Sequence, residues 1–72
     1  MNKGKLRIVV LKVLSARAMS GYSLMKKISE DIGWKPSPGS IYPLMTSLLK
    51  EELVDVKKDG RKKVYSLTEA GK

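Results

Sequence analysis

The sequence predicts an α+β fold in which three helices are followed by a two-stranded β-hairpin. Apolar residues recur at helical three-to-four spacing in three consecutive stretches before residue 52. After residue 52 the spacing changes to alternation on both sides of Asp59-Gly60, a dipeptide that is typical of a tight hairpin. A chain of 72 residues has room for one domain, which we expect to span residues 1–72.

The first helix is expected over residues 5–18. Its stripe toward the core consists of Leu6, Val9, Val10, Val13 and Leu14. Ile8 and Leu11 fall on the opposite side of this helix, where a monomeric protein would carry polar groups. These two residues are the candidate contact between two copies of the chain. The alternative is that they are two ordinary exposed aliphatic side chains.

Capping signals separate the second helix from the third. Ser20 is a good N-cap for the second helix, and Gly33 can close it in the left-handed conformation. After a proline-containing linker, Ser37 is the expected N-cap of the third helix and Pro38 its first residue, where no N–H is needed. Pro43 predicts a late start or a local kink in this helix.

The third helix, expected over about residues 37–52, has one apolar and one polar face. The inward residues are Ile41, Leu44, Met45, Leu48 and Leu49. The outward residues are Ser40, Pro43, Thr46, Ser47 and Lys50, with Tyr42 on the flank. A slim, polar and almost acid-free helix face fits a DNA major groove, which is about 12 Å wide.

The hairpin is expected to pair its strands through a two-residue Asp59-Gly60 link. This register opposes Val56 to Lys63 and Val54 to Tyr65. The expected buried face therefore consists of Val54, Val56, Tyr65 and Leu67. Five cations surround Asp59 at the end of the hairpin: Lys57, Lys58, Arg61, Lys62 and Lys63.

Composition excludes most enzymatic and metal chemistry. The chain has no cysteine and no histidine, which removes thiol nucleophiles, Ser-His-Asp triads and the usual zinc, haem and iron–sulfur ligands. Fifteen Lys and Arg against seven Asp and Glu give a net charge of +8. Such a balance is typical of proteins that bind nucleic acid. We therefore expect a binding protein with no metal and no cofactor, whose partner is a polyanion.

An anionic membrane surface, contacted by the first helix, is the other polyanionic candidate. The longest apolar run, residues 8–11, has four residues, whereas a spanning helix needs about 20. We therefore expect no membrane partner. The absence of cysteine fits a reducing compartment, and we expect a cytoplasmic protein.

Three helices followed by a basic hairpin form the arrangement of a winged helix-turn-helix. In this arrangement the third helix enters the major groove and the hairpin lies along the neighbouring backbone of double-stranded DNA. Phosphate contacts then supply affinity, and contacts to base edges supply selectivity. Two alternatives stay open: a non-specific nucleic-acid-binding protein, and a winged-helix adaptor that binds another protein.

Three segments carry a resemblance to a known family. They are Gly21-Tyr22, residues 34–44 with the sequence Trp-Lys-Pro-Ser-Pro-Gly-Ser-Ile-Tyr-Pro-Leu, and residues 61–71. They closely resemble the PadR family of winged-helix transcriptional regulators. The resemblance implies a homodimeric repressor that binds an inverted-repeat operator, with residues 37–50 as recognition helix and residues 57–63 as the wing.

The expected DNA-binding residues combine this resemblance with the polar helix face and the basic hairpin. They are Lys35, Ser37, Gly39, Ser40, Tyr42, Pro43, Thr46, Ser47, Lys50, Lys57, Lys58, Arg61, Lys62 and Lys63. Many members of the PadR family are released from DNA by phenolic acids or other small aromatic compounds. No residue of this sequence can be assigned to binding such an effector.

The sequence departs from the family pattern at two places. Glu52 stands where the family usually has a glycine that closes the recognition helix, so this turn must form without the residue that adopts the left-handed conformation most easily. Family members also continue into a long C-terminal helix that forms the dimer, whereas this sequence ends at Lys72. For such a short form we expect self-association through Ile8 and Leu11.

Overall fold

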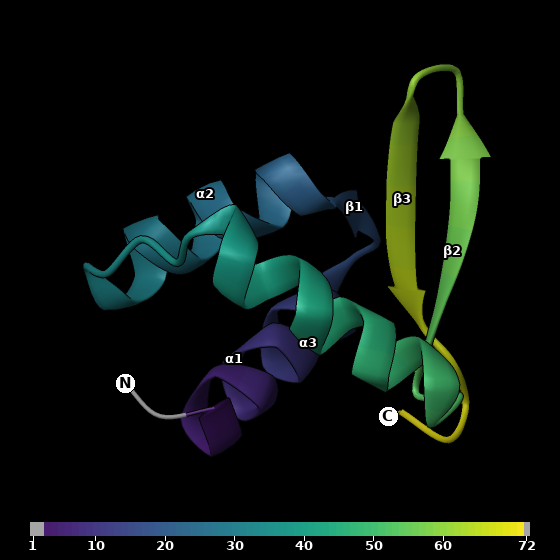
Figure 1. Cartoon of the computed structure of the whole chain (residues 1–72), viewed down its shortest axis with the longest axis horizontal. Helices are drawn as coiled ribbons and strands as arrows, with labels where there is room; N and C mark the ends of the chain where they lie inside the picture. Colours follow the sequence, from purple (N-terminus) through teal and green to yellow (C-terminus); the bar gives the residue numbers. More distant parts are fainter. Residues whose placement is uncertain (1–2, 72) are drawn as a thin grey trace.

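The computed structural model describes residues 3–71. In chain order its elements are α1 (Lys3–Ala16), β1 (Met19–Ser20), α2 (Gly21–Ile32), α3 (Pro38–Lys50), β2 (Val54–Asp59) and β3 (Lys62–Leu67). The strands form one antiparallel sheet in the order β1-β3-β2. The helices lie together beside this sheet, and the loop between β2 and β3 reaches beyond them at the top of Figure 1. The predicted winged helix is confirmed, with a β2–β3 hairpin as its wing.

The first helix ends two residues earlier than predicted, and a short strand follows it. Met19 pairs with Tyr65 and Ser20 pairs with Val64, which adds β1 to the edge of β3. The sheet therefore has three strands rather than the two that were predicted. A strand of two residues carries no detectable periodicity, so the sequence pattern could not show it.

Both predicted caps of α2 are confirmed. The Ser20 hydroxyl accepts a hydrogen bond from the backbone N–H of Ser23 at 3.2 Å. Gly33 adopts a left-handed conformation with φ 68°, and its N–H donates to the carbonyl of Ser29 at 2.9 Å. Ile32, at the last position of the helix, is exposed instead of facing the core, because the helix ends there.

The third helix begins at Pro38, as its capping signals predict, and ends at Lys50 rather than near residue 52. Two backbone N–H groups of its first turn donate to the carbonyl of Ser37, each at 3.0 Å. The helix continues through Pro43, so the predicted late start was wrong. Pro43 removes only one backbone hydrogen-bond donor from the helix. The packing of the buried side of α3 against the core keeps the other turns helical.

One hydrophobic core joins the helices to the sheet. Its buried members are Leu6, Val10, Val13, Leu14, Met19, Leu24, Met25, Ile28, Ile41, Met45, Leu48, Val54 and Tyr65. Burial of side chains of this size stabilises a fold by about 1.5–3 kcal/mol each. Ile41, Met45 and Leu48 follow one side of α3 and fix that side against the core. The opposite side of α3 is thereby held in solvent.

The two candidate dimer residues differ in exposure. Ile8 is 66% exposed, as predicted, but Leu11 is half-buried and packs against the core. The prediction that Leu11 faces away from the core was wrong, because α1 contacts both α2 and β3 and therefore buries more than one narrow stripe. Of this pair, Ile8 is the side chain that is available to a second copy.

The hairpin register differs by two residues from the prediction. The observed pairs are Val54 with Leu67, Val56 with Tyr65, Lys58 with Lys63, and Asp59 with Lys62. The loop is therefore Gly60-Arg61, with Gly60 at φ 63°. A type I′ turn with Asp59 and Gly60 as its two loop residues would need a positive φ at both of them. In the observed loop, Gly60 takes the positive φ and Asp59 does not, and glycine adopts this conformation without steric cost.

The correction leaves the composition of each hairpin face unchanged, because a shift of two residues preserves the alternation of side chains. Val54 and Tyr65 are buried, and Leu67 is half-buried. Val56 was predicted to be buried but is 39% exposed. It lies closer to the end of the wing, beyond the reach of the helices.

Glu52 makes the turn from α3 to β2 in the left-handed conformation, with φ 60°. Its N–H donates to the carbonyl of Leu49 at 3.0 Å, and its own carbonyl accepts from the Thr68 hydroxyl at 2.6 Å. These bonds involve only the backbone of Glu52. The side chain is thus dispensable for the turn, while its Cβ makes the backbone conformation unfavourable.

Substitution of Glu52 by glycine should raise the free energy of unfolding by about 1 kcal/mol, because the left-handed conformation carries no steric cost for glycine. Urea unfolding followed by circular dichroism measures this change. The matched control is Lys50→Gly in the last turn of α3, where the backbone is helical. There the glycine should destabilise the protein, and equal effects at both positions would contradict the explanation.

Candidate nucleic-acid interface

The outward side of α3 carries the side chains that the sequence assigns to base contacts. Ser40, Pro43, Thr46, Ser47 and Lys50 are all exposed, as predicted. The Thr46 hydroxyl donates to the carbonyl of Tyr42 at 3.0 Å within the helix. By contrast, the Ser47 hydroxyl and the Lys50 ammonium have no hydrogen-bond partner within residues 3–71. They are the groups of this face that are most available to a ligand.

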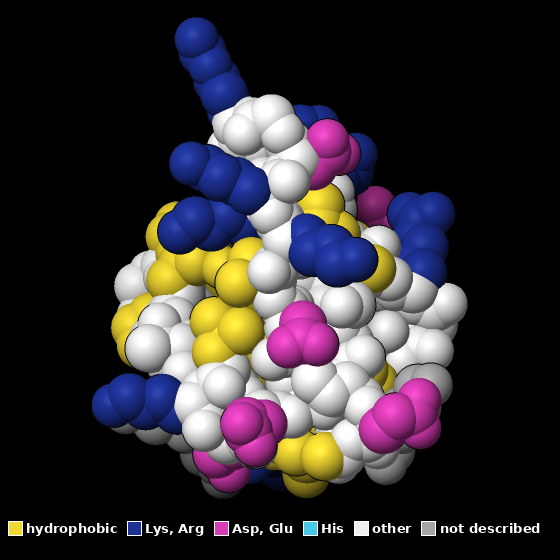
Figure 2. All heavy atoms as spheres, turned by 90° about the vertical axis from the view of Figure 1, so that its right-hand side faces the viewer, with side chains coloured by type: hydrophobic (Ala, Val, Ile, Leu, Met, Phe, Trp, Pro, Cys, Tyr) yellow, Lys and Arg dark blue, Asp and Glu magenta, His cyan; other side chains and the backbone are white. Residues whose placement is uncertain are grey.

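The end of the wing concentrates positive charge. Lys58 lies directly opposite Lys63 across the two strands, an arrangement that destabilises an isolated hairpin. Asp59 lies opposite Lys62 and compensates part of the charge. Figure 2 shows Lys and Arg side chains gathered around this end of the molecule, with most acidic side chains lower on the same face. An anion bound here would relieve the repulsion between the opposed lysines.

A cleft of about 560 Å³ joins α3 to the wing. We call it the wing cleft, and its lining consists of Ser20, Gly21, Tyr22, Ser23, Tyr42, Arg61, Lys62, Lys63 and Tyr65. It brings Tyr42 of the third helix together with three cations of the wing, although they are far apart in the sequence. The third helix and the basic hairpin therefore share one side of the molecule.

The remaining predicted residues lie around this cleft or outside it. Lys35 lines a smaller hollow of about 400 Å³ beside α2, together with Tyr22 and Lys26. Ser37 and Gly39 are exposed at the start of α3. Lys57 and Lys58 are exposed on β2 and are not among the residues that line the wing cleft.

Sequence reasoning missed the contribution of α2 to this surface. Tyr22, at the second position of α2, is 70% exposed and lines both the wing cleft and the smaller hollow. The neighbouring Ser20 and Ser23 also line the wing cleft. The segment Gly21-Tyr22, which carries part of the family resemblance, was the signal that could have pointed to this helix end.

The two inner tyrosines of the wing cleft are close enough to interact. Burial raises the pKa of the Tyr65 phenol above its ordinary value of 10.0, and the neighbouring Tyr42 raises this pKa further. Tyr65 is consequently uncharged at neutral pH and keeps its phenolic proton. A protonated phenol can donate a hydrogen bond to an anion.

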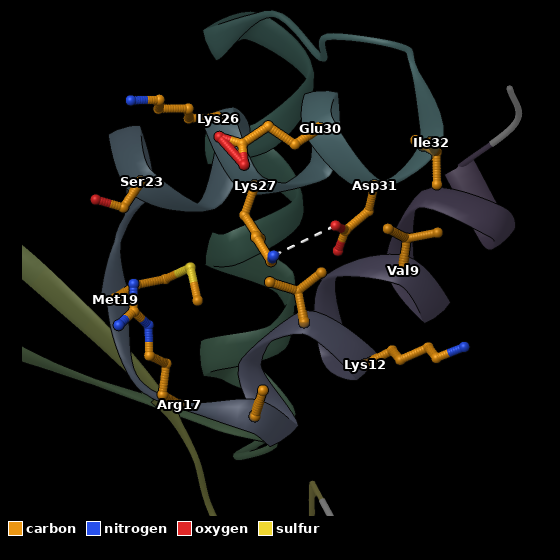
Figure 3. A pocket seen from close by; sticks show the side chains of 12 residues that line it. Val9, Lys12, Arg17, Met19, Ser23, Lys26, Lys27, Glu30, Asp31 and Ile32 are labelled. Carbon is orange, nitrogen blue, oxygen red and sulfur yellow. Dashed lines mark ion pairs between the residues drawn. The ribbon is translucent and has the colours of Figure 1, made fainter.

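A second groove, of about 920 Å³, lies between α1 and α2 (Figure 3). Val9 and Val13 contribute apolar side chains to it. The Lys27 ammonium and the Asp31 carboxylate form an ion pair of 3.4 Å within the groove. Because Glu30 also lines it, charges of both signs face this groove. The wing cleft, with three cations and no acidic lining residue, suits a polyanion better.

An ion pair connects the start of α1 to the end of α3. Both guanidinium nitrogens of Arg7 donate to the two carboxylate oxygens of Glu51, each at 2.6 Å. Hydrogen bonding to Arg7 lowers the pKa of the Glu51 carboxyl below its ordinary value of 4.5. The pair holds α1 beside the last turn of α3 on the molecular surface.

Because the folded-state pKa of Glu51 lies below the unfolded-state value, this pair stabilises the fold above about pH 4.5 and stops doing so as the pH falls through the lowered pKa. Arg7→Gln should therefore lower the midpoint of thermal unfolding at pH 7. The difference from the unsubstituted protein should disappear in strong acid. A difference that is independent of pH, measured by calorimetry between pH 2 and pH 7, would contradict this assignment.

Within residues 3–71, no helix is long and apolar enough to cross a lipid bilayer. The same part of the chain contains no group of three or more acidic side chains that could hold a metal ion. The features that remain are a helix with an acid-free outward face, a cationic wing and the cleft between them. Together they define a winged-helix protein with a cationic surface beside its third helix.

The chain matches the model of the transcriptional regulator PadR-like family over residues 10–72. It therefore belongs to this family, which confirms the resemblance seen in the sequence. Membership in a family of transcriptional regulators agrees with the prediction that the protein is not an enzyme.

Similar proteins include YqjI of Escherichia coli, a transcriptional regulator that is 39% identical over 71 residues. The match covers 94% of this chain but 34% of YqjI, so the chain spans about a third of that relative. The solved structure of H. salinarum RosR is 29% identical with a TM-score of 0.84, and the match covers 90% of this chain and 60% of RosR. Bacillus subtilis PadR, solved in complex with operator DNA, is 27% identical with a TM-score of 0.79. That match covers 92% of this chain and 40% of PadR.

Proposed function

We propose that the chain is a sequence-specific double-stranded DNA-binding domain of a transcriptional repressor. Its α3 enters the major groove, and its wing lies on the phosphate backbone. The observation that carries this proposal is the wing cleft, which joins Tyr42 of α3 to Arg61, Lys62 and Lys63. The structure of B. subtilis PadR with operator DNA supports it, because that protein shares the fold at 27% identity.

In this proposal the site residues divide into two groups by their chemistry. The cations of the wing bind phosphates and provide affinity without sequence preference. Ser47 and Lys50 of α3 reach base edges, where a hydroxyl or ammonium group can discriminate between base pairs. A cytoplasmic location would be consistent with this DNA-binding function, and it stays a prediction.

Selection of bound duplexes from a random pool tests the proposal. We expect an enriched inverted repeat, because a symmetric dimer binds two half-sites about one helical turn apart. Binding without any enriched sequence would favour a non-specific nucleic-acid-binding protein, and no binding at low salt would favour a protein adaptor. Placement of the selected duplex next to a promoter should lower reporter expression if the protein is a repressor.

The proposed homodimer uses Ile8 of α1 as an apolar contact. Ile8→Glu should shift the mass measured by light scattering from dimer toward monomer, because a charge would be buried without a partner. Lys12→Glu is the control on the same helix, where the side chain is exposed. Leu11 does not suit this test, because it packs against the core. An unchanged dimer mass for Ile8→Glu would reject this contact.

A further inference from the structure

Gly21 creates the space in which the ring of Tyr42 lies. A methyl group at Gly21 would stand 2.9 Å from both the Cε1 atom and the hydroxyl oxygen of Tyr42. Both contacts are shorter than non-bonded atoms normally allow. The missing side chain in the first turn of α2 thus lets the end of the Tyr42 ring lie directly against that turn.

This contact separates Tyr42 from the other polar side chains of α3. Tyr42 is 43% exposed, and it lines the wing cleft together with Arg61, Lys62 and Lys63. Ser47 and Lys50, on the outward side of the helix, do not line this cleft. Tyr42 therefore shares its surroundings with the cations of the wing and not with the base-reading side chains.

We propose that the Tyr42 hydroxyl binds a phosphate of the DNA backbone rather than a base, and that Gly21 is the positioning residue that places it. This inference rests on the proposed DNA-binding function and deepens it. It moves Tyr42 from the group that determines selectivity to the group that determines affinity and orientation.

The chemistry of the wing cleft favours a phosphate. Three cations line it without an acidic residue, so an anionic oxygen is stabilised there whereas a neutral base edge gains little. A phenolic O–H that donates to a phosphate oxygen forms a charge-assisted hydrogen bond.

Tyr42→Phe tests the phosphate contact. We expect its affinity to fall about tenfold, both for the duplex selected from the random pool and for a scrambled duplex of equal length and composition, as measured by fluorescence anisotropy. Ser15→Ala removes a hydroxyl that donates to the Lys12 carbonyl within α1, and it should leave both affinities unchanged. A loss confined to the selected duplex would assign Tyr42 to a base, and no loss would overturn the contact altogether.

Gly21→Ala tests the positioning role. The added methyl meets the far end of a side chain, so the ring can move away and the protein should keep its thermal midpoint within a few degrees. We expect the affinity of this variant to fall by a factor similar to that of Tyr42→Phe. The double variant should bind no more weakly than Tyr42→Phe alone, because the displaced ring then has no hydroxyl. Independent, multiplying losses would overturn the positioning role.

Proton NMR of the unsubstituted, DNA-free protein tests the geometry separately. A nuclear Overhauser effect is expected between the Gly21 Hα protons and the Tyr42 ring protons, because the ring lies only 2.9 Å from the place that a Cβ atom at Gly21 would occupy. Its absence would refute the placement whatever the protein binds. If this effect is present but no duplex is bound, the proposed function fails and the phosphate contact fails with it.

Discussion

Replacement of Lys62 and Lys63 by glutamine should make the salt dependence of DNA affinity shallower by about two units of slope. If about six cations contact phosphates, the logarithm of the affinity falls against the logarithm of the salt concentration with a slope of about −5. Removal of two contacts should change this slope to about −3, because each contributes about −0.9. At about 0.1 M salt, the corresponding loss of affinity is roughly 60-fold.

This loss cannot be attributed to unfolding of the wing. Neutralisation of Lys63 removes its repulsion with Lys58, whereas neutralisation of Lys62 removes its attraction to Asp59, so the two effects oppose each other. The free energy of unfolding of the double variant should therefore not fall substantially. Lys12→Gln with Lys27→Gln removes the same charge from the groove between α1 and α2 and should leave the slope unchanged. Loss of sequence preference in the wing variant would mean that the wing reads bases.

Replacement of Ser47 and Lys50 by alanine should remove most of the preference for the selected duplex over a scrambled one. Each good contact to a base edge is worth about 1–3 kcal/mol of discrimination. The affinity ratio between the two duplexes should therefore fall on the order of a hundredfold. The salt slope should change by one unit at most, because only Lys50 carries a charge.

The effects of the Ser47 and Lys50 substitutions can be compared with the effect of a substitution in the wing. Lys58→Ala removes one cation from the wing, so it should weaken binding to both duplexes equally and preserve their ratio. If Ser47→Ala and Lys50→Ala had the same uniform effect, α3 would not be the element that reads the sequence. The selectivity would then have to come from the shape of the DNA or from another part of the protein.

The helices could be predicted because their signals are local. Ser20 and Gly33 bound α2 through hydrogen bonds to neighbouring backbone groups, and the Ser37-Pro38 start of α3 depends only on local conformation. The turn at Glu52 was also predictable, since its conformational cost belongs to one residue. These features need no knowledge of the tertiary contacts.

The missed features depend on contacts between distant segments. Met19 becomes a strand residue only because β3 offers it an edge, and Leu11 is half-buried because α1 packs on two elements at once. The hairpin register depends on whether the loop is Asp59-Gly60 or Gly60-Arg61. Gly60, which adopts the positive φ, belongs to both of these loops. No periodicity in the sequence distinguishes these alternatives.

The same division applies to the interface. The acid-free face of α3 and the basic wing are visible in the sequence as patterns of residue type. The sequence does not show that the α3 face and the wing meet at the wing cleft. This meeting requires Gly21, Tyr42 and Lys63 to approach one another from three separate elements. Tyr22 was missed for this reason, since its role depends on the position of its helix relative to the wing.

The most direct test of the central claim maps the DNA-contacting surface by NMR. Backbone amide shifts are recorded while the protein is titrated with the selected duplex. The account predicts that the largest changes fall on residues 37–50 of α3 and residues 57–63 of the wing. Changes confined to α1 and to the groove that α1 forms with α2, with the wing unaffected, would contradict it.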